Sequence, residues 1–298
     1  MKAPLPIVNG VGPSSRWLPA GPWKTVLDFL RKEYSQVDVE TWITRMTRGE
    51  VLDQNGRQVD PETAYRAGAC IFYYRELVDE PVIPFVEQVL YQDEHILVAD
   101  KPHFLPVIPS GRFLHETLLV RLRNKYNHEA LVPIHRLDRE TAGVVLFSVN
   151  PETRRHYTSL FRNQQVRKVY EALAPTLDGV RLPSVRRSRI VRGEPFFRMK
   201  EVPGDANSET EVIRIRNLGR DSLYQLVPVT GRKHQLRLHL AALGIPIIND
   251  QLYPRMSRTE ASDFSRPLKL LAKSISFPDP LTGRELYFES GRRLEVRG

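Results

Sequence analysis

The sequence contains a single cysteine, Cys70, so no disulfide can form within the chain. It also lacks any run of about 18 uninterrupted apolar residues, the length that a membrane-spanning helix requires. Its first residues carry no apolar stretch of signal-peptide length. We find no internal repeat and no low-complexity tract. These absences argue against a disulfide-stabilised secreted domain and against a membrane protein, and they predict a protein of the reducing cytoplasm.

What the sequence has instead is an excess of positive charge. Its 298 residues include 44 Lys and Arg against 35 Asp and Glu, which gives a net charge of +9 and a pI near 9.7. A polyanionic partner is the first interpretation, and a basic surface without a partner is the alternative. One stretch, residues 181–198, contains six arginines and one acid, Glu194, and Gly193 and Pro195 argue against a regular helix there. We therefore predict a basic loop suited to a phosphate backbone. Its arginines are Arg181, Arg186, Arg187, Arg189, Arg192 and Arg198.

The chain divides at a proline-bearing stretch, residues 80–85. We therefore expect a small N-terminal domain over residues 1–84 and a larger domain over residues 85–298. In the first, apolar spacing predicts two short helices, followed by a small strand pair. The helices carry Leu27, Phe29, Leu30 and Tyr34, and then Trp42, Ile43 and Met46; the strands contain 51–52 and 70–74.

Strands and helices alternate in the second part, which predicts an α+β fold. Helices are expected through Leu118, Leu119, Leu122 and Tyr126, after Asn150 as N-cap, and from Thr230 to Gly244. Strands are expected at 89–91, 96–99, 144–149, 166–173, 210–215, 223–229, 268–277 and 285–288.

A polar loop, residues 134–143, precedes the buried strand that begins at Val144. Asp138 in this loop could simply satisfy backbone donors of a turn, as aspartates often do. Arg136 and Arg139 flank it, however, and two cations beside one carboxylate would lower its pKa and keep it ionised for nucleophilic work. The residues alone leave both interpretations open.

The run His135-Arg136-Leu137-Asp138-Arg139-Glu140-Thr141-Ala142-Gly143 resembles the signature of the RluA-type RNA pseudouridine synthases, with Ala142 in place of the usual Ser. Three further stretches resemble motifs of the same family in the same order. They are residues 92–102, residues 167–170 and residues 230–239. The resemblance implies a pseudouridine synthase fold, with a central mixed, largely antiparallel sheet flanked by helices and loops.

The resemblance also implies residue roles. Asp138 would act on a flipped-out uridine, Tyr170 would remove or relay the C5 proton, and Arg237 would pair with Asp138. RNA-binding residues are expected to be His135, Arg136, Arg139, Lys168, Arg186, Arg187, Arg189, Arg232, Lys233, His234, Gln235 and Leu236. The reaction requires no cofactor, and the histidines lack a recognised metal-ligand spacing. We therefore expect neither a cofactor nor a bound metal ion. We expect a monomer acting on ribosomal or transfer RNA.

Spacing is compatible with these roles. In a strand, Lys168 and Tyr170 project to one face and Val169 to the other. In a helix, Arg237 shares a face with His234, Leu238 and Ala241, while another face carries Leu236, Leu240 and Leu243.

The N-terminal part resembles the αL RNA-binding module named after ribosomal protein S four, through the stretches 47–51, 55–59 and 67–71. A purely structural appendage is the alternative for this part. For the whole chain, the rival hypotheses are a noncatalytic RNA-binding or ribosome-assembly factor and a nuclease that uses His135 and His234.

Overall fold

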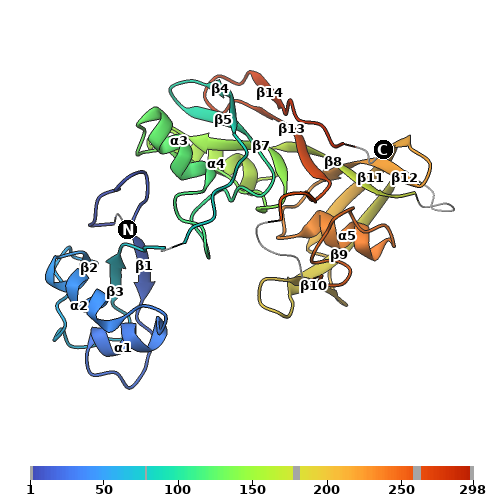
Figure 1. The fold of residues 1–298 in the computed structure, drawn as a ribbon. Helices are drawn as coiled ribbons and strands as arrows, with labels where there is room; N and C mark the ends of the chain where they lie inside the picture. The colour runs from blue at the N-terminus through green and yellow to red at the C-terminus, as the bar shows by residue number, and fades with distance from the viewer. Residues whose placement is uncertain (1–2, 78, 177–181, 258–262, 296–298) are drawn as a thin grey trace.

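The computed structural model describes residues 3–77, 79–176, 182–257 and 263–295, which form two separate sheets (Figure 1). The described helices are α1 (Val26–Glu33), α2 (Val39–Thr47), α3 (Leu118–Tyr126), α4 (Arg154–Arg162) and α5 (Gln235–Ala242). The small sheet contains β1 (Ser14–Trp17), β2 (Val51–Asp53) and β3 (Cys70–Tyr73). The large sheet contains β4 (Gln88–Gln92), β5 (Ile96–Lys101), β6 (Val132–Pro133), β7 (Ala142–Ser148), β8 (Arg167–Pro175), β9 (Ser184–Arg192), β10 (Met199–Val202), β11 (Ser208–Asn217), β12 (Asp221–Pro228), β13 (Leu270–Pro278) and β14 (Glu285–Glu289).

The small sheet is antiparallel in the order β1–β3–β2 and shares a core with α1 and α2. A capping box begins α1: the Thr25 hydroxyl accepts the N–H of Asp28, and the Asp28 carboxylate accepts the N–H of Thr25. Phe29 and Trp42 bring the buried faces of the two helices together. The predicted helix pair and strand pair are confirmed. The sequence pattern did not predict β1, because its residues Ser-Ser-Arg-Trp carry no apolar alternation.

The large sheet has the order β10–β9–β11–β12–β8–β13–β7–β5–β4, with β14 paired to β13 and β6 to β7. Neighbouring strands are antiparallel except β13 and β7, which are parallel. The predicted mixed, largely antiparallel sheet is therefore confirmed.

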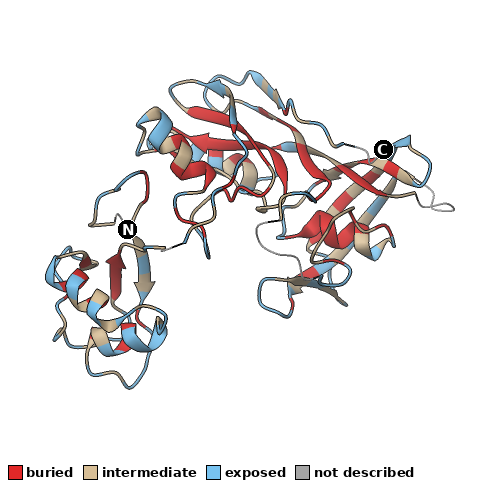
Figure 2. Ribbon diagram, in the orientation of Figure 1, coloured by how far each residue is buried: buried red, intermediate tan, exposed pale blue. Residues whose placement is uncertain are grey.

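Both faces of the sheet are covered at β5 and β7, which explains their continuous apolar runs. Leu97 of β5 and Phe147 of β7 point to a core that contains the buried side of α3. The alternate residues Val98 and Leu146 point to a second core with Tyr157 of α4. Figure 2 shows these strands buried along their length.

The other half of the sheet is packed against α5 (Figure 2). Leu236 and Leu240 share a core with β8, β11 and β12, whereas Leu238 packs with Ile190 and Tyr253. The two predicted faces of this helix are thus confirmed, and both are covered. Arg237, on the face that carries Leu238, is 1% exposed and therefore enclosed by protein.

Two helix starts differ from the prediction. Asn150 does not cap α4: its side chain accepts the N–H of Glu152, and the helix begins after Thr153. Asn150 instead begins a turn that precedes the helix. The last helix begins at Gln235 rather than at Thr230, because the chain reaches it through a left-handed residue, His234, with φ of +57°.

The predicted basic loop is wrong as a description of the backbone. Arg186, Arg187, Arg189 and Arg192 lie on a regular strand, β9, whose residues alternate between partly covered and exposed. Gly193 and Pro195 form only the turn that joins β9 to β10. Arg181 lies outside the described residues.

The stretch between the sheets is bound to the large unit. The Glu80 carboxylate accepts N–H groups just before α3, including that of Glu116, and the Arg121 guanidinium donates to the carbonyls of Ile83 and Phe85. The expected division between residues 84 and 85 stays a prediction. No helix in the described ranges is long and apolar enough to cross a membrane.

Candidate active site

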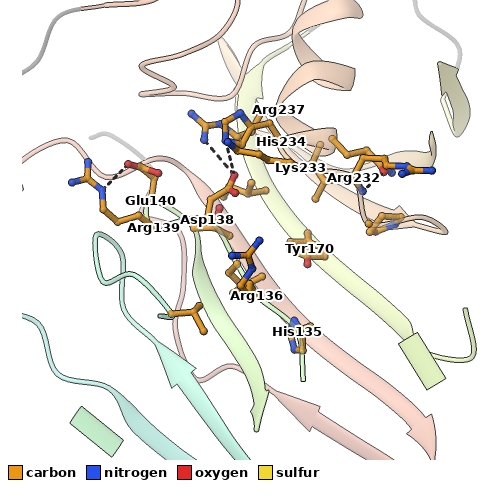
Figure 3. Close-up of a pocket in the computed structure, with 18 of the residues that line it drawn as sticks. His135, Arg136, Asp138, Arg139, Glu140, Tyr170, Arg232, Lys233, His234 and Arg237 are labelled. Carbon is orange, nitrogen blue, oxygen red and sulfur yellow. Dashed lines mark hydrogen bonds and ion pairs between the residues drawn. The ribbon is translucent and has the colours of Figure 1, made fainter. Parts of the chain in front are cut away.

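A cleft of about 1160 Å³ opens over the large sheet between the 134–141 loop and the beginning of α5 (Figure 3). Asp138 and Glu140 are its two acidic lining residues. Its basic lining residues are Arg136, Arg139, Arg162, Lys168, Arg192, Arg232, Lys233 and Arg237. A cleft with this excess of cations attracts polyanions.

Asp138 lies on the loop immediately before β7. The loop is fixed by Gly143, which has φ of +115° where β7 meets β13; a Cβ atom there would lie 2.1 Å from the carbonyl oxygen of Ala272. The Asp138 side chain is 25% exposed, so it is open to a ligand. Within the described residues its carboxylate accepts no backbone N–H bond, which removes the main support for a turn-capping role.

Arg237 lies behind Asp138. Its Nη1 is 3.3 Å from Asp138 Oδ2 (Figure 3), while Nε and Nη2 bind both oxygens of Asp250 at 2.8 and 2.7 Å. Burial alone would lower the pKa of Arg237, but the hydrogen bonds and charge of Asp250, together with Asp138, raise that pKa. The guanidinium is therefore a permanent positive charge beside the exposed carboxylate.

Asp250 was not predicted from the sequence. It lies in the loop after α5, where its carboxylate also accepts the N–H groups of Leu252 and Tyr253. No motif points to it. Its role depends on chain reversal after the helix, which brings it back beside Arg237.

His234 and Tyr253 complete this side of the site. His234 Nε2 lies 3.8 Å from Asp138 Oδ2, and its Nδ1 is 2.8 Å from the Tyr253 hydroxyl. Burial lowers the pKa of His234, and the charge of Asp138 only partly opposes this effect. At neutral pH His234 therefore contacts Asp138 and Tyr253 as a neutral ring.

Tyr170 projects from β8 into the cleft on the same face as Lys168. It packs against the core that contains Leu236. Burial and the nearby Asp138 charge raise the pKa of the Tyr170 phenol. The phenol is therefore protonated at neutral pH.

The charge beside Asp138 does not come from Arg139, contrary to the expectation. Arg139 Nε binds Glu140 Oε1 at 2.8 Å (Figure 3), and its guanidinium lies over the ring of Phe113. Arg136 lines the cleft without an acidic partner among the described residues.

Lys101 supports the 134–141 loop through a hydrogen bond to the Arg139 carbonyl. This role was also not predicted from the sequence. Its fully buried Nζ donates to the carbonyls of Pro102, Leu105 and Arg139 at 2.8 to 3.1 Å. Burial lowers the pKa of Lys101 to about 7, although the charges of Glu140 and Asp138 oppose this. Its position at the end of a buried strand was the available signal.

Two predicted RNA-binding side chains are occupied inside the protein. His135 Nε2 accepts the N–H of Leu146 at 3.1 Å, and its ring stacks on Phe161. Burial lowers the pKa of His135 to about 3, so it is neutral at physiological pH, and this argues against a nuclease that uses it as an acid. Gln235 donates to Thr210 and accepts from Thr230, which closes the turn before α5.

The remaining predicted residues divide into two groups. Arg232 and Lys233 line the cleft, and the Arg232 Nε also donates to the carbonyl of Asn207. Arg186, Arg187 and Arg189 lie on β9, outside the cleft lining. Of the described residues, no group of three or more His, Cys, Asp or Glu side chains is placed to hold a metal ion.

Comparison with known proteins identifies relatives of this chain. The sequence profile of the RNA pseudouridylate synthase family matches residues 95–242. An uncharacterized RNA pseudouridine synthase of Synechocystis is 32% identical over 233 residues, covering 76% of this chain and 79% of the relative. The dual-specificity RNA pseudouridine synthase RluA of Haemophilus influenzae is 30% identical, covering 70% of this chain and 94% of the relative.

Solved structures agree with the fold. Human RNA pseudouridylate synthase domain containing 4 gives a TM-score of 0.53 at 27% identity, covering 70% of this chain and 88% of that one. Human RNA pseudouridylate synthase domain containing 1 gives a TM-score of 0.58 at 21% identity, covering 72% of this chain and 86% of that one.

The fold and the sequence relationships together define an RNA pseudouridine synthase, an isomerase that modifies RNA. Within that class, this chain belongs to the RluA family.

Proposed function

We propose that Asp138 is the group that attacks or deprotonates the sugar of a flipped-out uridine in structured RNA. The observation that carries this proposal is the partly exposed Asp138 carboxylate in a basic cleft, held by the buried Arg237. A carboxylate with a permanent cation behind it stays anionic when a bound base excludes water.

The isomerisation breaks the bond between N1 and C1′, forms a bond between C5 and C1′, removes the C5 proton and adds a proton to N1. Asp138 would either bond to C1′ and later leave, or take the 2′ proton and return it. Tyr170, as a protonated phenol, would relay the C5 proton rather than receive it as a phenolate. Leu236 would pack beneath the base.

Binding of the RNA would depend on the cleft cations. Within the described chain, Arg136, Arg162, Lys168, Arg192, Arg232 and Lys233 line the cleft without a salt bridge. Such cations are available for phosphates, and Arg136 would hold the extruded nucleotide. Extrusion of the nucleotide costs a few kcal/mol, and the binding free energy of these contacts would have to offset that cost.

The RNA target in this proposal is a uridine of ribosomal RNA in the cytoplasm. Transfer RNA is tested beside it, because one yeast relative is named as a tRNA pseudouridine(32) synthase. The proposal includes action as a monomer.

We also propose that the small N-terminal unit is an αL-like RNA-binding module. Its two capped helices against an antiparallel sheet support this assignment. Lys32 lies exposed on α1, and Arg48 lies exposed at the end of α2, where phosphates could reach both.

The test uses ribosomal and transfer RNA tritiated at uridine C5, incubated with the full chain. Tritium release by the wild type, its loss in Asp138→Asn, and retained RNA binding by that variant are expected. Asp205→Asn, which changes an exposed aspartate, is the matched control and should release tritium normally. Binding without release from either RNA would favour the noncatalytic assembly factor, and cleaved RNA would favour the nuclease.

A further inference from the structure

The turn between β9 and β10 presents two aromatic rings to solvent. It is closed by hydrogen bonds from the Arg198 N–H to the Pro195 carbonyl and from the Gly193 N–H to the Arg198 carbonyl. Phe196 is 83% exposed, the highest value among the large apolar side chains described. Central positions of turns usually hold Gly, Asn, Asp, Ser or Pro. Neither turn geometry nor core packing therefore accounts for Phe196.

The second ring connects this turn to the cleft. Phe197 is 37% exposed and lines the cleft, and the Phe196 ring contacts it edge-on with centroids 5.5 Å apart. Phe197 thus supports Phe196 at the margin of the cleft.

The turn is also fixed relative to Asp138. The N–H of Met199, where β10 begins, donates to the Tyr253 hydroxyl at 2.8 Å, and the Arg198 guanidinium lies 5.0 Å from the Tyr253 ring centroid. Tyr253 in turn contacts His234, which lies 3.8 Å from Asp138. A group bound on the turn would be held at a set position relative to the carboxylate.

The surroundings select the chemistry of that group. Arg192 lines the cleft on the same hairpin, and Lys200 is exposed on it. An aromatic ring among cations matches single-stranded nucleic acid, whose bases stack on rings while its phosphates meet cations. Base-paired nucleotides hide their faces, so only an unpaired base can use the ring.

We infer that Phe196 is a stacking platform for an unpaired base that neighbours the target uridine. This rests on the proposed function, and it assigns the substrate class as RNA whose target lies in a loop or other unpaired segment. Phe196 positions RNA and determines specificity, and it takes no part in the chemical step.

The first arm of the test is kinetic. Phe196→Ala is expected to raise the KM for the tritiated RNA roughly 5- to 160-fold, the range of one lost base stack, with kcat little changed. Phe196→Trp should retain the wild-type KM. Tyr287→Ala, which removes an exposed aromatic on β14 outside the cleft lining, is the matched control.

The second arm measures binding directly. An RNA hairpin with 2-aminopurine in its loop should lose fluorescence on binding wild type and Tyr287→Ala, but not on binding Phe196→Ala. A probe labelled in the stem should respond equally to all three. Equal KM and equal quenching for Phe196→Ala and the control would overturn the platform, as would a change confined to self-association or protein binding.

The two arms separate this inference from the proposed function. If the wild type releases no tritium, the proposed reaction fails, while quenching that depends on Phe196 would still support the platform. If tritium is released and Phe196→Ala behaves like wild type in both arms, the platform alone fails.

Discussion

Arg237 is bound more closely by Asp250, at 2.7 and 2.8 Å, than by Asp138, at 3.3 Å. Asp250 thus orients the guanidinium, and Asp138 uses the one nitrogen that remains. A bidentate pair fixes the plane of an arginine side chain. The geometry of Asp138 therefore depends on a second aspartate that is itself buried and lies outside the cleft lining.

Replacing Asp250 by Asn should lower kcat by about 100-fold, the scale of a misplacement of about 1 Å, while leaving the Kd for RNA nearly unchanged. Single-turnover tritium release and a filter-binding assay measure the two quantities. Asp279→Asn, at a carboxylate that binds Tyr157 away from the cleft, is the control. A rise in Kd with normal kcat would assign Asp250 to RNA binding instead.

Replacing Tyr170 by Phe should reduce kcat by roughly 10²- to 10⁴-fold, the usual effect of losing a proton-transfer group, and leave KM similar. If the phenol relays the C5 proton, deuterium at C5 should slow the variant more than it slows the wild type. An unchanged isotope effect would mean that the phenol only packs against the base. Tyr287→Phe controls for loss of a hydroxyl.

The arginines of β9 differ in how free they are. Arg187 binds Glu209 at 2.8 Å and Arg186 binds Glu201, whereas Arg189 is exposed and has no acidic partner in the described ranges. If β9 contacts phosphates, Arg189→Gln should reduce the slope of log K against log salt by about 0.7 to 0.9. Arg187→Gln should reduce it less, because Glu209 already neutralises that charge.

Titrations of RNA binding from low to high salt measure this slope. Arg293→Gln, which removes an exposed arginine near the C-terminal end of the described chain, should leave it unchanged. An unaltered slope in Arg189→Gln would remove β9 from the RNA interface.

The sequence predicted the large elements because their apolar periods are strong. The strand at β7 and the two faces of α5 are examples, since burial on both sides leaves a continuous apolar pattern. The pairing of Asp138 with Arg237 came from motif resemblance. Asp250 lies outside the motifs and could not be found this way, because its role arises from the chain reversal after α5. Lys101 lies within the stretch 92–102, but its contact with the distant Arg139 carbonyl could not be read from that stretch. The prediction that the charge of Arg139 lies beside Asp138 was wrong, because the Arg139 guanidinium pairs with its neighbour Glu140 instead.

Lys101 should matter for stability as well as for the loop. Lys101→Met leaves two buried carbonyls and one partly buried carbonyl without their donor, so the free energy of unfolding should fall by roughly 1 to 3 kcal/mol. Urea unfolding measures this, with the exposed Lys125→Met as control. A normal midpoint and slope would show that water replaces the ammonium without loss.

The buried His239 should make the protein sensitive to acid. Its Nδ1 lies 2.9 Å from the Thr210 hydroxyl and its Nε2 3.0 Å from that of Ser188, and burial lowers its pKa to about 4 despite the nearby Glu201. Between pH 6.5 and about 4 the unfolded chain binds a proton that folded His239 does not, so the free energy of unfolding must fall as the pH falls.

The contribution of one such group is at most about 1.4 kcal/mol per pH unit. His239→Gln, which keeps a polar side chain between the hydroxyls, should therefore have a shallower decline across this window than the wild type, even if it is less stable at pH 7. Urea unfolding at half-unit pH steps gives the two curves, and the exposed His156→Gln controls for loss of an imidazole. Parallel curves for wild type and His239→Gln would mean that His239 is protonated in the fold, with the hydroxyls and Glu201 accepting its charge.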